Sequence, residues 1–339
     1  MKIVCEVEMI DSPHLYHLYS GFLTLETMGI IELKLKTPGN DGNVYKPILH
    51  VKINNSITVV YDLLDGFNWI SGTIEENLKF FQEEYKNVDY YFKRSFNNKL
   101  LDYKAKTTKI LALGLFYRIE KPDFLKNKYK VRAKEIMRGF NLFTVEKNQF
   151  CAPPILSDLN SMLYTRLWDP SDVEAQHLKE ERELININRI ESILACKKEF
   201  KDRFVGGLSN TPYAQKKAKS LVLDGNITNR KNYLTTLKST AISIVNLGLH
   251  NSNGGRFAES VAASRAIVTE PLVYQATGDF LENKNYLTFT DKEMLLSQVE
   301  SLLSSPKKVK TMMEYNYKYY NNYLRPENLV LNSLIEVLK

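Results

Sequence analysis

The sequence has few cysteines and no long apolar run. Its three cysteines, Cys5, Cys151 and Cys196, lie far apart in the chain, and none of their spacings matches a zinc site or a redox motif. This favours reduced, packed thiols in a cytoplasmic protein. No run approaches the roughly 20 apolar residues of a membrane-spanning helix, and residues 1–7 lack the basic and apolar regions of a secretory signal. We therefore expect a cytoplasmic protein.

Strong charge and two common phosphate motifs are also missing. The net charge is only +7, and Lys and Arg are spread along the chain, so nucleic-acid binding is not indicated. A mild positive excess suits an anionic nucleotide or an acidic membrane surface, although a solvated lysine-rich surface is the alternative. The absence of a Gly-x-Gly-x-x-Gly after the first strand-like run and of a Gly-Lys-Ser/Thr loop counts against a dehydrogenase, a kinase and an ATPase.

What the chain does contain is an alternation of strand-like runs and helical patterns. Strands are expected in the first half near residues 2–7, 57–61, 88–92 and 109–113, and helices near 13–28, 74–85 and 129–137. The second half has expected strands near 161–165, 203–205, 220–223, 241–247 and 266–269, with a long helix at 172–200. This predicts an α/β protein with two Rossmann-like parallel-sheet domains that face a cleft. The domains are expected at 1–155 and 156–318, with a hinge near 151–154.

The most informative stretch spans residues 241–270. An apolar run of strand length is followed by a polar loop with two glycines and then by a helix that carries Arg256 and Glu259. These two residues are three apart and share one helix face, and the free amides of a first helical turn attract anions. The stretch predicts a site for a phosphorylated nucleotide, and a surface ion pair between Arg256 and Glu259 is the alternative.

Ligands of open parallel sheets bind beyond the carboxyl ends of the strands, so the polar residues at those positions are candidates. In the first half they are Asp11, His14, Asp62, Asp65, Lys93 and Arg94. In the second half they are Arg166, Asp169, Gly206, Gly207, Asp224 and the loop 251–256. A cleft between the two halves is expected to collect most of them.

Several strings of the second half resemble a known family. They are Gly206-Gly207-Leu208, the run from YLTTLKSTAISIVNLGLHNSNGGRFAES to IVTEPL at 233–272, ENKNYLTF at 282–289 and YYNNYLRPENLV at 319–330. They are similar to bacterial glycosyltransferases of the GT-B fold, within these to the group-one-like enzymes that build surface polysaccharides. TRLWDP and YYFKRSF resemble the same relatives more loosely. The resemblance implies that residues 319–339 form a helix that crosses back to the first domain.

The resemblance also implies roles for single residues. The second domain would hold a UDP-, GDP- or TDP-linked sugar, with Glu259 at the ribose hydroxyls and with Asn253, Gly254, Gly255 and Arg256 in the turn at the diphosphate. No metal and no further cofactor are implied, in agreement with the lack of an Asp-x-Asp triplet. One departure concerns Asn251, because retaining relatives often carry a glutamate there. The retaining or inverting outcome therefore stays open.

Three further residues complete the predicted donor site. Arg166 is a second cation for the diphosphate, or a surface arginine paired with Asp169. Gly206 and Gly207 permit close backbone approach to the donor, or form a tight turn.

The catalytic base of an inverting transfer is expected from the first domain. Asp11 and His14 are the first candidates and Asp65 is the next. Their alternatives are a helix start at Asp11-Ser12-Pro13 and a turn at Asp65-Gly66. Lys93 and Arg94 are expected to contact phosphate or an acidic acceptor, and the alternative is a solvated strand end.

The sequence thus predicts a metal-independent glycosyltransferase for a glycan or lipid-linked glycan acceptor, in bacterial surface polysaccharide or glycoprotein assembly. Peripheral contact with the inner membrane is compatible with this function. Two alternatives stay open. One is a non-catalytic nucleotide- or glycan-binding protein of the same fold, and the other is a sugar-nucleotide epimerase.

Overall fold

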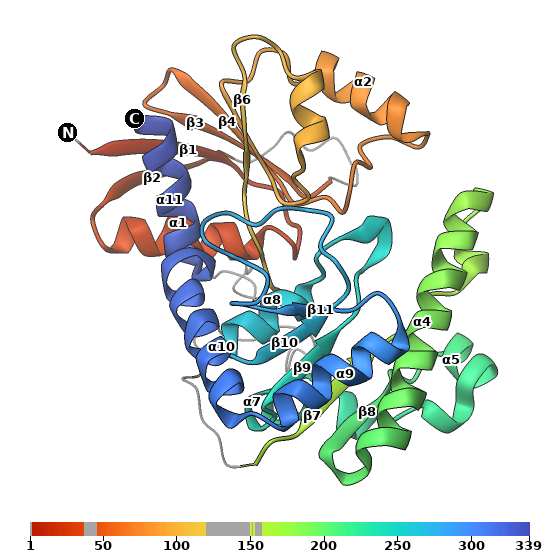
Figure 1. Ribbon diagram of the computed structural model, residues 1–339. Coiled ribbons are helices and arrows are strands. Elements are labelled where there is room, and N and C mark those ends of the chain that lie inside the picture. Colours follow the sequence, from red (N-terminus) through yellow and green to blue (C-terminus); the bar gives the residue numbers. More distant parts are fainter. Residues whose placement is uncertain (1, 37–45, 120–149, 151, 153–157) are drawn as a thin grey trace, which may run out of the picture. The chain divides into compact units, whose positions relative to one another are not determined.

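The computed structural model describes residues 2–36, 46–119, 150, 152 and 158–339. The chain falls into two compact units (Figure 1). The first comprises Met1–Lys147, Val273–Gly278 and Asn321–Lys339, and the second comprises Asn148–Leu272 and Asp279–Tyr320. The helix expected at 129–137, Cys151 and most of the expected hinge lie outside the described residues.

The first unit is built on a six-stranded sheet. Its strands are β1 (Ile3–Glu8), β2 (Ile31–Lys36), β3 (Ile48–Ile53), β4 (Ile57–Asp62), β5 (Tyr90–Lys93) and β6 (Lys109–Ala112), in the order β2-β1-β3-β4-β5-β6. All neighbours are parallel except that β3 runs antiparallel to β1 and β4. The sheet is therefore mixed, whereas the sequence predicted a parallel sheet without β2 and β3. Asn54 and Asn55 have φ of 51° and 58°, the left-handed pair that a tight hairpin turn between β3 and β4 requires.

Among the described residues of this unit, three α-helices pack on the sheet or beside it. They are α1 (Tyr16–Thr27), α2 (Ile74–Glu84) and α11 (Pro326–Leu338), and α11 packs against α1. Helix α2 begins with a capping box between Thr73 and Glu76. Helix α1 was expected to start near residue 13 with Asp11 or Ser12 as its cap. It begins at Tyr16 instead, and no side chain caps it.

A fully buried histidine lies inside α1. His17 has 0% exposure, and its ring packs 4.8 Å from the ring of Tyr117. Burial lowers the pKa of His17 from 6.5 to about 3, and the backbone of Leu324 opposes this only in part. Below pH 6.5 this histidine is therefore protonated in the unfolded chain but stays neutral in the folded chain. The free energy of unfolding must then decrease as the pH decreases.

We expect His17→Leu to make the first unit less sensitive to acid. Between pH 6.5 and about 3, one such histidine removes up to about 1.4 kcal/mol of stability per pH unit. Urea unfolding followed by the fluorescence of the buried Trp69, in a Trp168→Phe background, measures the stability of this unit. His50→Leu, which replaces an exposed histidine, is the matched control. Equal pH slopes for His17→Leu and the parent would contradict this account.

The second unit has a fully parallel sheet. Its strands are β7 (Ser161–Thr165), β8 (Phe204–Leu208), β9 (Ile242–Val245), β10 (Ala266–Thr269) and β11 (Leu287–Thr288), in the order β11-β10-β9-β7-β8. The strand expected at 220–223 is wrong. Lys219–Leu221 form a 3-10 turn, and only Val222 bridges to Leu208 at the end of β8.

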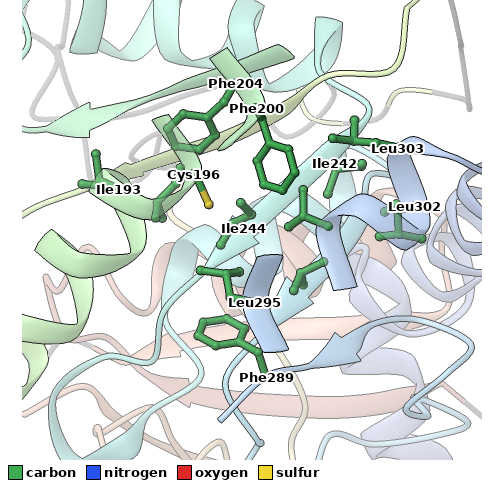
Figure 2. Packing of buried hydrophobic residues seen from close by; sticks show 14 of the residues in the cluster. Ile193, Cys196, Phe200, Phe204, Ile242, Ile244, Phe289, Leu295, Leu302 and Leu303 are labelled. Atoms are coloured by element: carbon green, nitrogen blue, oxygen red, sulfur yellow. The ribbon is translucent and has the colours of Figure 1, made fainter. Parts of the chain in front are cut away.

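The core of this unit lies between the sheet and its helices. The helices are α4 (Gln176–Phe200), α5 (Pro212–Ala218), α6 (Gly225–Thr228), α7 (Arg230–Ser239), α8 (Gly255–Ala262), α9 (Lys292–Leu303) and α10 (Pro306–Tyr319). Figure 2 shows Cys196 and Phe200 of α4 beside Ile244 of β9, with Leu295 and Leu302 of α9 in the same cluster. Cys5 and Cys196 are buried free thiols, as their expected packing role requires.

Candidate functional site

A cavity of about 170 Å³ lies at the carboxyl ends of β7 and β9. In the strand order of this sheet, β7 has β8 on one side and β9 on the other. From β7 the chain continues to β8 on one side of the sheet, and from β9 it continues to β10 on the other side. The gap between β7 and β9 is therefore the topological switch point, where open α/β sheets bind ligands. The strand residues that line the cavity are Met162, Leu163, Tyr164, Thr165, Ser243, Ile244 and Val245.

The N-terminus of α8 forms another wall of this cavity. Gly254 is the N-cap, no side chain caps the helix, and Gly254, Gly255 and Arg256 all line the cavity. A Cβ atom built on Gly254 or Gly255 would meet nothing within 4 Å, so the fold itself does not require glycine there. The first-turn amides and the positive end of the helix dipole are available to an anion in the cavity.

Basic side chains surround the same space. Arg166 and Arg256 line the cavity with Arg189 of α4. The Arg166 guanidinium lies 3.9 Å from the centre of the Trp168 ring. Nη1 of Arg256 is buried without a hydrogen-bond partner among the described residues. A buried donor left without an acceptor is costly, and an anion in the cavity would satisfy it.

Arg189 holds the two strand ends in place. It donates to the carbonyls of Arg166, at 2.6 Å, and of Leu247, at 2.8 Å. Burial lowers its pKa to about 10 against the opposing charge of Glu270, and Arg256 and Arg166 lower the pKa further. Three arginines are thus close together at the cavity, with Glu270 near Arg189 as an opposing charge.

Glu259 does not form the surface ion pair with Arg256 that was the alternative to a binding role. It is buried, and Oε1 accepts a hydrogen bond of 2.6 Å from Arg230 of α7. Oε2 is buried and accepts no well-formed hydrogen bond within the described part of the chain. Burial and then the charge of Glu259 raise the pKa of Tyr233 well above its usual value. Tyr233 lines the cavity, whereas Glu259 lies beside it.

Three other residues predicted to contact the donor do not line the cavity. Gly206 and Gly207 lie within β8 rather than after a strand, and neither lines the cavity. A Cβ on Gly206 would meet the Phe204 ring at 2.2 Å, and one on Gly207 would meet the carbonyl oxygen of Leu221 at 2.7 Å. Close packing within the unit explains these glycines. They are needed neither for a tight turn nor for the approach of a donor to the backbone. Asn253 is buried in the loop before α8 and does not line the cavity either.

The loop after β9 adopts an unusual backbone conformation. His250 and Asn251 have φ of 57° and 55°, in the left-handed region that costs a non-glycine residue about 1 kcal/mol or more. The backbone N–H of His250 donates to Glu181 of α4 at 2.6 Å. Asn251, the position of the departure from the family pattern, is exposed. The strained loop directly adjoins Gly248, which lines the cavity.

The predicted catalytic residues all lie in the first unit. Asp11 is exposed and accepts a hydrogen bond of 2.7 Å from the Tyr16 hydroxyl. Asp65 precedes Gly66, which has φ of 59°, and pairs with the guanidinium of Arg94. His14 is near the same arginine, because Arg94 contributes to the lowering of its pKa after burial and Arg118. Asp65 and His14 are therefore neighbours of one buried cation.

Lys93 and Arg94 do not lie at a solvated strand end. Lys93 is 0% exposed and pairs at 3.1 Å with Asp62, which is also fully buried. Asp62 accepts further hydrogen bonds from Trp69 at 2.8 Å and Tyr91 at 2.5 Å. Burial lowers the pKa of Lys93, although the charge of Asp62 opposes the shift. The charge of Asp62 is thus neutralised by Lys93, and its oxygens accept hydrogen bonds from the core of the same unit.

Arg189, Arg230 and Tyr233 are site residues that sequence reasoning missed. Arg189 could have been found, because Asn186 and Arg189 stand on the face of α4 that otherwise buries Ile193, Cys196 and Phe200. Polar residues at helical spacing within an apolar stripe indicate a buried polar role. No comparable local signal marks Arg230 or Tyr233.

Metal ligands and membrane spans were also sought. The described residues contain no group of three or more His, Cys, Asp or Glu side chains arranged to hold a metal ion. Within the same part of the chain, no helix combines the length and apolar character needed to cross a bilayer.

Comparisons with known proteins bear on the fold. No family model matches the sequence, and no curated protein sequence matches it. Among solved structures, HepE of Anabaena in complex with UDP has 11% identity and a TM-score of 0.50, over 99% of this chain and 100% of that one. Sucrose-phosphate synthase of Thermosynechococcus elongatus has 12% identity and a TM-score of 0.44, over 94% and 71%. WaaG, a glycosyltransferase involved in lipopolysaccharide biosynthesis, has 10% identity and a TM-score of 0.43, over 97% of both chains.

The likeness to HepE extends over both units and shows the fold. The chain has the two Rossmann-like sheets of GT-B glycosyltransferases, which confirms the predicted fold class. At this identity the likeness shows the fold alone, and function must be argued from the site.

Proposed function

We propose that this protein is a glycosyltransferase that moves a sugar from a nucleotide-sugar donor to a glycan or lipid-linked glycan acceptor. The observation that carries the proposal is the cavity at the switch point of the second sheet, where the N-terminus of α8 meets Nη1 of Arg256. Among the residues that the structure describes, no side chain caps this helix end and Nη1 has no hydrogen-bond partner. Helix amides, a helix dipole and a guanidinium together form a site for a diphosphate.

The same groups would act on the leaving nucleotide. As the glycosidic bond to the donor breaks, negative charge grows on the diphosphate, and preorganised donors stabilise it. Arg256 and the α8 amides would supply this stabilisation, with Arg166 as a second cation beside the cavity. This provides a route to transfer without a metal ion. Glu259, fixed by Arg230, would accept a ribose hydroxyl on its remaining oxygen.

The acceptor is assigned to the first unit. In an inverting transfer a carboxylate or imidazole removes the proton of the attacking hydroxyl. Asp11 is exposed and accepts a hydrogen bond from the Tyr16 hydroxyl. Asp65 is partly exposed but contacts Arg94, which weakens it as a base. Asp11 is therefore our preferred base, ahead of Asp65 and His14.

The fold likeness and the sequence support our proposal for the donor base and the setting. HepE was solved with UDP, so UDP is the first nucleotide to test, with GDP and TDP after it. We place the reaction in the bacterial cytoplasm, in surface polysaccharide or glycoprotein assembly, with peripheral contact between the enzyme and the inner membrane.

The site is tested by Gly255→Ala. Within the described part of the chain the added methyl group meets no atom within 4 Å, and alanine favours a helix by up to about 1 kcal/mol over glycine. We therefore expect the variant to be at least as stable as the parent without ligand. Because the methyl group projects where a diphosphate would approach the amides, the thermal stabilisation by UDP, GDP or TDP without metal should be lost or strongly reduced.

Gly225→Ala is the matched control. Gly225 also opens a helix, has equally open surroundings and does not line the cavity. It should keep the full nucleotide response. Absence of any nucleotide response in the parent, or equal responses in both variants, would contradict the donor site. Donor consumption with and without acceptor then separates a transferase from an epimerase and from a non-catalytic binding protein.

A further inference from the structure

Loops from several strands of the first sheet gather basic side chains at one edge. His14 follows β1, Arg94 follows β5 and Arg118 follows β6. These strands point the same way, because β3 reverses direction between β1 and β4. Phe116 joins the group, since its ring lies 5.6 Å from the His14 ring and 4.7 Å from the Arg94 guanidinium.

The contact between Arg118 and His14 fixes which imidazole nitrogen carries the proton. Nη2 of Arg118 lies 3.1 Å from Nε2 of His14. An arginine can only donate, so Nε2 accepts, and the proton of the neutral ring is on Nδ1. Burial, then Arg118 and Arg94, lowers the pKa of His14 to about 4, which keeps the ring neutral near pH 7. Nδ1 is buried and has no hydrogen-bond partner among the residues that the structure describes.

Arg94 contributes a second donor without an acceptor. Its side chain is only 4% exposed, and Nη2 contacts Asp65. Its Nε is buried and makes no hydrogen bond in the described part of the chain. Two buried donors of this cluster, His14 Nδ1 and Arg94 Nε, thus have no acceptor among the described residues, and each unsatisfied buried donor costs about 1 to 3 kcal/mol. An acceptor supplied from outside would remove that cost.

We propose that His14, Arg94 and Arg118 bind an oxyanion, a phosphate or carboxylate group, carried by the acceptor. Oxyanions accept several charge-assisted hydrogen bonds at once, and arginine matches their geometry. The assignment of the oxyanion to the acceptor rests on the proposed function, whereas the binding of the anion does not. In this role His14 donates a hydrogen bond to the oxyanion through Nδ1–H and does not serve as the catalytic base.

The test uses the full chain with ¹⁵N-labelled histidine rings and inorganic phosphate as the probe. The chain has five histidines, so the His14 signals can be assigned by comparison with His14→Gln. We expect a saturable shift of the His14 Nδ1 resonance. Arg118→Ala should weaken phosphate binding about tenfold or more, and because Arg118 is exposed the variant should fold. Arg325→Ala, which removes a partly exposed arginine of the same unit, should leave the affinity unchanged.

Sodium acetate, in a parallel titration, distinguishes a carboxylate from a phosphate preference. The proposal would be overturned if neither phosphate nor acetate shifted the His14 resonance more than sodium chloride does at the same ionic strength. Equal phosphate affinity in the parent and Arg118→Ala would also overturn it. Nucleotide binding by the second unit is measured separately through Trp168, so a failure of the donor site and a failure of this site are distinguishable.

Discussion

Replacing Arg256 with alanine is expected to weaken the binding of a nucleoside diphosphate by roughly 10- to 150-fold, the equivalent of one charge-assisted hydrogen bond. Arg256 lines the cavity of the second unit, and its Nη1 has no hydrogen-bond partner among the described residues. This nitrogen is therefore available to a ligand, while the guanidinium lies 5.3 Å from the centre of the Tyr233 ring. The largest loss is expected for diphosphates and a smaller one for nucleosides.

The measurement is a fluorescence titration with UDP, since Trp168 lines the same cavity. Arg203→Ala is the matched control, because Arg203 is half-exposed and pairs with Glu300 at 3.3 Å. Arg256→Lys keeps the charge but loses the planar fork, so an intermediate affinity is expected. Unchanged UDP affinity in Arg256→Ala would rule out a phosphate contact for this residue.

Replacing Lys93 with methionine is expected to destabilise the first unit by about 3 to 5 kcal/mol, because the charge of Asp62 is left buried without its partner. Lys93 and Asp62 are both 0% exposed. Lys86→Met breaks a surface pair with Glu83, whose side chain is 76% exposed. That control should cost less than about 1 kcal/mol.

Urea unfolding followed by Trp69 fluorescence measures both effects in a Trp168→Phe background. Combining Lys93→Met with Asp62→Asn removes both charges and should recover much of the lost stability. The prediction would be wrong if Lys93→Met cost less than about 1 kcal/mol, the range of a surface ion pair. It would also be wrong if the double variant were no more stable than Lys93→Met.

The elements that the sequence predicted well are those with a local signal. Residues 266–269 form β10 as expected, and the helix expected at 172–200 is α4, Gln176–Phe200. The sequence did not reveal β3, because its antiparallel place between β1 and β4 depends on pairing and not on composition. The strand expected at 220–223 has suitable residues but no pairing partner beyond one bridge.

The site shows the same limit. Gly254, Gly255 and Arg256 are consecutive, so a strand, loop and helix pattern was enough to bring them together at the cavity. The partner of Glu259 is Arg230, 29 positions earlier, and no spacing rule connects two helices at that distance. Buried ion pairs of this kind follow from tertiary packing, which a single sequence does not disclose.

The first unit is assembled from three separate stretches of chain, with α11 against α1. A ribosome delivers α1 early and residues 326–338 late, so the two partners cannot meet until the intervening second unit has been synthesised. The second sheet, whose strands all lie between residues 161 and 288, can close sooner. Until then the face of α1 that α11 covers is exposed, including the position of Gly21, where an added Cβ would meet Pro326 and Val330 of α11. The strands of the first sheet lie between residues 3 and 112 and are synthesised first, but the first unit is completed only when α11 packs against α1, after the second unit has been made.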